Sequence, residues 1–106
     1  TFLERKGIDI KAKQGSAIRS SSDGVVAFAD WLKGYGLLLI IAHGLGDVSL
    51  YAHASSLLVD VDDQVKAGQL VGTVGDTGLT GNSMLYFEVR AGGKAVDPIK
   101  WLVARK

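Results

Sequence analysis

The sequence predicts an all-β domain, and two observations support this prediction. The chain has 14 glycines and one proline among its 106 residues. Its apolar segments are short, rich in Val, Ile and Leu, and separated by Gly, Asp, Asn or Ser, which is typical of β-strands joined by turns. A chain of this length supports one core that buries roughly 60–65% of the surface exposed in the unfolded chain. We therefore expect a single domain over residues 1–106.

Each strand is expected at an apolar run bounded by turn-forming residues. The run GLLLIIAHG is apolar almost throughout, which suits a strand covered on both faces, and the next run returns from the Gly44-Leu45-Gly46 turn to complete a central hairpin. A second hairpin is expected near the end of the chain, with its turn at Gly92-Gly93. The expected strands cover residues 7–12, 16–21, 24–30, 36–44 and 47–54, part of 64–75, and the two arms of a terminal hairpin within 84–98.

Two short helical turns are also expected. The segment SSLLV at 55–59 has a serine at a possible N-cap, and DPIKWLVA at 97–104 has Asp97 as a cap and Pro98 at the first helical position. Both are single-turn pieces, so the fold class stays all-β with a short C-terminal helical turn.

Composition excludes several classes of function. The net charge is +1, from 12 basic and 11 acidic residues, and no basic block suits nucleic acid. The absence of cysteine rules out disulfides, thiol catalysis and thiolate zinc sites. The longest apolar run, residues 37–42, is far shorter than the roughly 20 residues that span a bilayer, so no membrane insertion by this domain is expected. Because the chain begins at Thr1, we expect it to be the C-terminal part of a longer protein.

Two histidines and scattered carboxylates are the whole inventory for metal or acid–base chemistry. His43 and His53 are expected to lie near one another in the central hairpin, and each is more simply read as a structural histidine than as a ligand. A zinc hydrolase normally needs three protein ligands and a base for the metal-bound water. With two histidines and no cysteine, such a site would have to use both histidines and one carboxylate as its ligands. Only another carboxylate would then remain to act as the base.

At this point several segments resemble the LytM domain of the M23 peptidoglycan endopeptidases. The resemblance covers nearly the whole chain and implies an antiparallel, sandwich-like sheet of the duplicated hybrid motif type with a cleft. It rests on the segments GIDI (7–10), DGVV (23–26), GYGLLLIIAHG (34–44), LYAHASSLLV (50–59), VKAGQLVGTVGDTGLTG (65–81), LYFEVR (85–90) and VDPIKWL (96–102).

The zinc site of active M23 members is largely replaced in this sequence. Such members use as ligands a histidine four residues before an aspartate, that aspartate, and the second histidine of an HxH pair. Asp9 keeps the aspartate position and His53 keeps the histidine of the YAH motif, which handles proton transfer in active members. The other positions hold Arg5, Met84 and Tyr86, and a guanidinium offers no lone pair to zinc. The resemblance therefore implies a pseudo-peptidase with no catalytic residues, no metal and no cofactor.

The segments ADWLKGYG and LYFE narrow the resemblance to the degenerate LytM domains of EnvC-like and NlpD-like activators. These activators stimulate periplasmic cell-wall amidases during division. The resemblance implies a location in the periplasm or cell envelope and a cleft that has become a groove for a regulatory helix of the amidase. Alternation along 84–90 predicts Leu85, Phe87 and Val89 in the core and the opposite side chains toward the groove. The expected groove residues are Lys6, Ile8, Tyr35, Leu38, Tyr51, Tyr86 and Arg90.

Three alternatives stay open at this stage. The first is a residual zinc metalloendopeptidase that cleaves peptidoglycan crosslinks with Asp9, His53 and unconventional ligands. The second is a lipoyl or biotinyl carrier, although Lys66 lies inside its motif and not at a hairpin tip. The third is a sugar phosphocarrier, which needs two facing histidines. Peptidoglycan binding without cleavage is also left open as an accessory function.

Overall fold

The described part of the computed structural model, residues 7–78 and 81–99, consists of β-strands joined by turns, with helical residues at Pro98 and Ile99. All the strand pairs are antiparallel, which confirms the predicted all-β class. Among these residues no helix has the length and apolar character needed to cross a membrane. The strands are β1 (Ile8–Lys11), β2 (Ala17–Arg19), β3 (Gly24–Leu32), β4 (Gly36–Gly44), β5 (Asp47–Leu57), β6 (Gln64–Val65), β7 (Leu70–Val74), β8 (Met84–Ala91) and β9 (Lys94–Val96).

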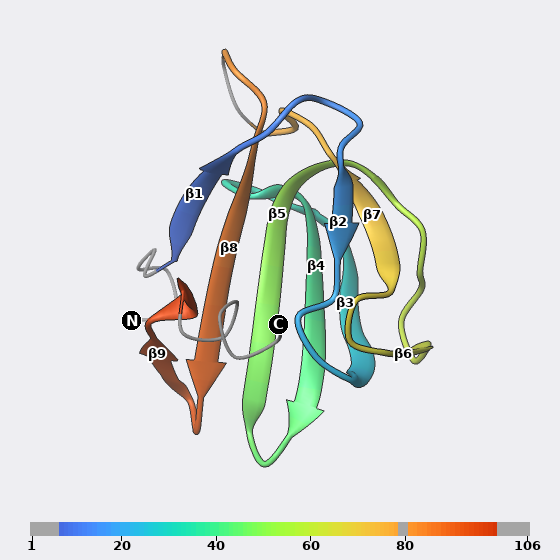
Figure 1. Cartoon of the computed structure of the whole chain (residues 1–106), viewed down its shortest axis with the longest axis vertical. Helices are drawn as coiled ribbons and strands as arrows, with labels where there is room; N and C mark the ends of the chain where they lie inside the picture. Colours follow the sequence, from blue (N-terminus) through green and yellow to red (C-terminus); the bar gives the residue numbers. More distant parts are fainter. Residues whose placement is uncertain (1–6, 79–80, 100–106) are drawn as a thin grey trace.

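The strands form one sheet whose main path runs β1-β8-β5-β4-β3-β6 (Figure 1). The 11-residue strand β5 holds this sheet together because it has three partners. Its first part pairs with β4 and β8, and its last part pairs with β7, which in turn pairs with β2. Strand β9 extends the sheet by pairing with the end of β8.

The two faces of the main sheet carry separate apolar clusters. The main core lies on one face, together with β2, β6 and β7, and contains Ile18, Val26, Leu39, Ile41, Tyr51, Ala54, Val59, Val65, Val71, Val74, Phe87 and Val89. The opposite face, called here the second face, carries Tyr35, Leu38, Leu50, Ala52 and Tyr86, with Phe28, Leu32, Ile40 and Val48 half-buried around them.

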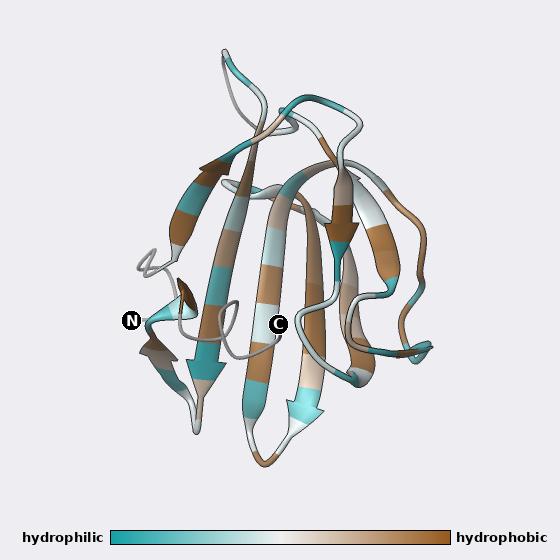
Figure 2. Ribbon diagram, viewed as in Figure 1, coloured by the Kyte–Doolittle hydropathy of each residue, from teal (hydrophilic) through white to brown (hydrophobic). Residues whose placement is uncertain are grey.

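The predicted central hairpin and the terminal hairpin are both present. Strand β4 has the bounds expected from its apolar run, and Figure 2 shows its ribbon brown along most of its length because it supplies apolar side chains to both faces. On β8, Phe87 and Val89 are in the main core and Leu85 packs against it, as the alternation predicts.

The predicted helical turn at 55–59 is wrong, because β5 continues to Leu57. Ser56 lies opposite Thr73 of β7, and the hydroxyls of Ser55 and Ser56 are each hydrogen-bonded to the Thr73 hydroxyl, at 2.7 and 2.6 Å. Strand pairing with β7 therefore outweighs the local capping tendency of these serines. Of the turn predicted over 97–104, residues up to Ile99 are described, and Asp97 accepts the Ile99 N–H at 3.0 Å. The remainder lies outside the described residues.

Candidate functional site

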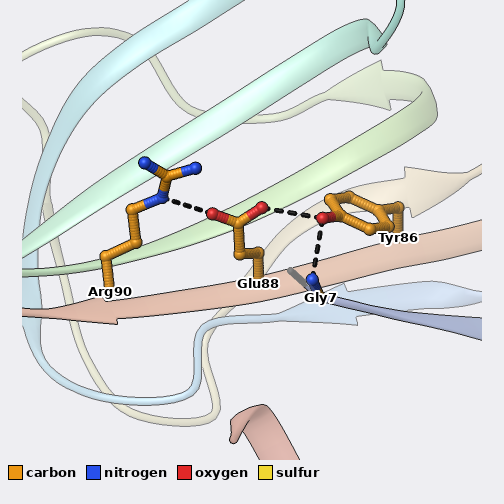
Figure 3. Close-up of polar contacts among 4 residues, drawn as sticks. All are labelled: Gly7, Tyr86, Glu88 and Arg90. Carbon is orange, nitrogen blue, oxygen red and sulfur yellow. Dashed lines mark hydrogen bonds and ion pairs between the residues drawn. The ribbon is translucent and has the colours of Figure 1, made fainter. Parts of the chain in front are cut away.

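A chain of hydrogen bonds links β1 to β8 at the position where the family resemblance places a zinc ligand. The Gly7 N–H donates to the Tyr86 hydroxyl at 2.8 Å, and that hydroxyl donates to Glu88 Oε1 at 2.7 Å (Figure 3). Arg90 Nε donates to the other carboxylate oxygen, Oε2. Both oxygens of the Glu88 carboxylate are therefore engaged by named donors.

The surroundings of Tyr86 favour the neutral form of its hydroxyl beyond that of an ordinary tyrosine. Burial, followed by the hydrogen bond to Glu88, raises the pKa of Tyr86 to about 12. Glu88 has no exposed side-chain surface, and the adjacent Arg90, whose side chain is 17% exposed, compensates its charge. An unpaired buried carboxylate would be strongly destabilising.

The donor set around Tyr86 does not fit zinc. A neutral phenol that already donates one hydrogen bond and accepts another is a poor ligand, and the Met84 thioether is a soft ligand that suits copper(I) better than a hard or borderline ion. Within residues 7–78 and 81–99 no group of three or more histidine and carboxylate side chains could hold a metal ion. Arg5 lies outside the described residues.

The two positions that match the active family, Asp9 and His53, lie near Tyr86. Asp9 is an exposed residue of β1, directly opposite Tyr86 in the register. His53 is fully buried, and its ring meets the Tyr86 ring edge-on with centroids 6.5 Å apart. Met84 is half-buried and lies opposite Lys11.

The predicted groove residues are split between the two faces. Tyr35, Leu38 and Tyr86 share the second face, as expected. Tyr51 does not, because its ring packs in the main core at 5.3 Å from Phe87, and its hydroxyl accepts the Ser21 N–H. Ile8 and Tyr51 therefore do not share a face with Tyr35, Leu38 and Tyr86, which corrects the expectation that all five line one groove.

Ile8 is placed by its register. It lies opposite Phe87 and packs against the main core, away from Tyr86. Arg90 lies next to Val48 of β5 in the register, but its guanidinium is engaged with Glu88. Lys6 is outside the described residues.

The sequence reasoning missed the half-buried part of the second face. Phe28 lies directly opposite Ile40, and Val48 is two residues from Leu50, the partner of Ile40 on β5. These three side chains are accessible, whereas Tyr35, Leu38 and Tyr86 are at most 6% exposed. Alternation along β3, β4 and β5 could have indicated these three residues, but the sequence prediction treats β4 as covered on both faces.

A second feature missed from the sequence is a basic pocket at one end of β1. It has a volume of about 410 Å³ and is lined by Lys11, Ala12, Lys13, Asn82 and Ser83. Lys11 pairs with Met84, the first residue of β8, so the pocket lies at the start of β8, two residues before Tyr86. Two ammonium groups at one pocket give this end of the sheet a local positive charge.

The two histidines do not face one another, which corrects the expectation that they lie close together. His43 is near the turn of the central hairpin, with its ring nitrogens 2.7 Å from Asp23 O and 2.7 Å from Ser49 Oγ. His53 lies at the opposite end of the β4–β5 hairpin, beside the start of β4, since Ala42 pairs with Val48 while Leu37 pairs with Ala54. The facing pair that a sugar phosphocarrier needs is therefore not formed.

The antiparallel architecture described above defines a class of protein, an M23-type domain. The family model of Peptidase family M23 matches residues 4–98, and the chain belongs to this family. A crystal structure of a putative M23 peptidase from Pseudomonas aeruginosa superposes with a TM-score of 0.88 at 26% identity, covering 96% of this chain and 45% of that one.

Two curated relatives have a higher sequence identity to this chain than the Pseudomonas aeruginosa peptidase has. The murein hydrolase activator EnvC of Escherichia coli is 48% identical over 100 residues, covering 94% of this chain and 24% of EnvC. The murein hydrolase activator NlpD of Escherichia coli is 46% identical over 101 residues, covering 94% of this chain and 26% of NlpD. The chain thus spans about a quarter of the length of these curated relatives.

Proposed function

We propose that this domain is a catalytically inactive M23 member that binds and activates a periplasmic cell-wall N-acetylmuramoyl-L-alanine amidase. In this proposal it acts during septal peptidoglycan splitting and daughter-cell separation, and its partner is the regulatory helix of the amidase. No metal or cofactor takes part in its action. The identity to two murein hydrolase activators supports the activating role.

The observation that carries the proposal is the state of Tyr86. In a hydrolytic M23 site this position supplies a metal ligand, according to the family resemblance. Here the Tyr86 hydroxyl accepts a hydrogen bond from Gly7 and donates one to Glu88, and its pKa, raised to about 12, makes loss of its proton to a metal less favourable than for an ordinary tyrosine. A group held in this way stabilises the sheet and is not available for metal chemistry.

The second face supplies a surface suited to a helix. Phe28, Ile40 and Val48 are half-buried apolar side chains from three adjacent strands, and they border a buried floor of Leu38 and Leu50. An amphipathic helix covers such a surface with apolar residues spaced three and four apart. In this proposal the second face is the docking face, and its accessible anchors are these three residues. They replace Ile8 and Tyr51 among the groove residues predicted from the sequence.

Charge can orient the bound helix. Lys11 and Lys13 border the basic pocket at one end of β1, next to Met84. Complementary charges at the rim of an interface set its orientation and association rate more than its affinity. We therefore expect acidic residues in the part of the amidase helix that reaches this end of the domain.

The test is dye release from labelled peptidoglycan by a purified amidase, with and without the domain. The variants Ile40→Lys and Val48→Lys place a charge on the docking face while the lysine stem still covers apolar surface, so folding is preserved. Leu58→Lys is the matched control, because Leu58 is an apolar residue with 54% exposure outside the second face.

Stimulation by the wild-type domain and by Leu58→Lys, but not by the two docking-face variants, is the expected result. Charge reversal at Lys11 should slow association, with Lys94→Glu on β9 as its control. No stimulation of any cell-wall amidase by the wild-type domain would refute the activator role. Stoichiometric zinc in protein purified without chelator, together with cleavage of crosslinked peptides, would instead establish the residual endopeptidase.

A further inference from the structure

We infer that His53 is a positioning residue that fixes two turns beside the second face, and that the domain needs its hydrogen-bond donor and not its proton-transfer chemistry. The two turns are residues 33–36 and 75–78, called here the paired turns. The inference rests on the proposed function, since these turns adjoin the face proposed to receive the amidase helix.

The backbone at His53 departs from regular strand geometry. Leu39 pairs with Tyr51 and Leu37 pairs with Ala54, so Ala52 and His53 together face one residue of β4, which is a β-bulge. His53 has φ +68°, a left-handed conformation that is uncommon outside glycine. The extra residue turns the imidazole toward Tyr86 on the second face, while Tyr51 points into the main core.

His53 is bonded to both of the paired turns. Its N–H donates to the Tyr35 carbonyl oxygen at 2.8 Å, and its Nδ1 lies 2.9 Å from the Thr77 carbonyl oxygen. A carbonyl oxygen can only accept, so Nδ1 carries the proton and donates. One residue therefore joins the turn before β4 to the turn after β7.

Thr77 completes the connection. Its hydroxyl accepts the Leu37 N–H at 3.1 Å and donates to the Ala54 carbonyl oxygen at 2.6 Å. The turn at 75–78 is therefore hydrogen-bonded to the start of β4, next to the turn at 33–36, and to β5 at the bulge and directly after it.

The paired turns also pack backbone against backbone. A Cβ atom added at Gly36 would lie 2.2 Å from the Thr77 carbonyl oxygen, and one added at Gly78 would lie 2.6 Å from the Gly36 nitrogen. Such close packing leaves no room for one turn to shift without the other. Because the Tyr35 ring lies 6.2 Å from the Tyr86 ring, a shift of the paired turns would alter the second face itself.

Two substitutions at His53 separate the donor from the imidazole. His53→Asn places an amide N–H close to the position of Nδ1 and tolerates positive φ, but it cannot transfer protons as imidazole does. His53→Gly also accepts positive φ but has no donor. Thr77→Val removes the hydroxyl bonds without changing the backbone conformation at His53, and serves if His53→Gly does not fold.

The first readout is amidase stimulation as a function of domain concentration. His53→Asn should match the wild type within about twofold. His53→Gly loses one side-chain hydrogen bond and Thr77→Val loses two, so both should raise the concentration for half-maximal stimulation by at least about tenfold, with an unchanged plateau. Loss of activity in His53→Asn equal to that in His53→Gly would overturn the inference, because imidazole itself would then be required. Full activity of both His53→Gly and Thr77→Val would overturn it as well.

The second readout does not depend on an amidase. The Leu37 amide, which donates to Thr77, should exchange with solvent about tenfold faster in His53→Gly than in wild type or His53→Asn, while the Ile41 amide in mid-strand should not change. If the wild-type domain stimulates no amidase, the proposed function fails, and the exchange rates alone decide the role of His53. Equal Leu37 exchange in all three proteins would refute the positioning role.

Discussion

Removal of the Tyr86 hydroxyl tests how this side chain stabilises the fold. The variant Tyr86→Phe leaves the Gly7 N–H without its acceptor and takes one donor from the fully buried Glu88 carboxylate. A hydrogen bond to a charged group contributes about 1.5–3 kcal/mol, so we expect a loss of about 2–3 kcal/mol in the free energy of unfolding. For a domain of this size the melting temperature should fall by roughly 10–20 °C.

A double-mutant cycle measured by urea denaturation makes this test specific. Tyr86→Phe and Glu88→Gln should show a coupling energy of about 1–2 kcal/mol, because the two side chains share a hydrogen bond. Tyr51→Phe is the matched control, since it removes another buried hydroxyl on the opposite face, and its effect should add to that of Glu88→Gln within about 0.5 kcal/mol. A coupling energy below about 0.5 kcal/mol for Tyr86 and Glu88 would refute the reasoning.

Three further predictions concern pH, packing and a turn. Folding raises the pKa of Tyr86 to about 12, so the stability that its protonated hydroxyl contributes is complete below the unfolded pKa of about 10 and is lost as the pH rises toward 12. The free energy of unfolding measured between about pH 10 and 12 should therefore fall less steeply with pH in Tyr86→Phe than in the wild type. Gly36→Ala should lower the free energy of unfolding, measured by chemical denaturation, by at least about 3 kcal/mol, because its Cβ would collide with a backbone oxygen. The control Gly15→Ala, with φ +90° but open space around it, should lower it by only about 1 kcal/mol. Equal losses in the two variants would contradict the packing argument. Leu45→Asn should raise the free energy of unfolding, measured by calorimetry, by about 0.5–1 kcal/mol. Leu45 is 99% exposed and has φ +57° in a two-residue hairpin turn, a position that favours asparagine. A loss of stability would show that the Leu45 side chain is needed.

Strands with a strong local pattern were predictable from the sequence. The apolar run of β4 gave its correct bounds, and the alternation along β8 assigned Phe87 and Val89 to the core. The serines at 55 and 56 show the limit of local reasoning. Their capping tendency was real, but hydrogen bonds to Thr73, 17 and 18 residues away, decided in favour of a strand.

Assignment to a face was less predictable across β5. Strict alternation would place Tyr51 and His53 on the same face, and yet they lie on opposite ones, because the bulge at Ala52 and His53 adds a residue that a period-2 pattern does not reveal. The predicted groove set therefore combined Tyr51 with residues of the opposite face, and it did not contain Phe28, Ile40 and Val48, which lie on the second face.

The sequence by itself determined the class of strands and turns, the family, and the identity of the side chains at the positions where the family resemblance places zinc ligands, because these depend on local pattern and residue type. Only the tertiary structure decided what Tyr86 does there. Its hydroxyl joins Gly7, 79 residues away in sequence, to the buried Glu88, and its raised pKa results mainly from burial in the folded sheet. Long-range register and burial set such contacts, and neither can be read from the spacing of residues along the chain.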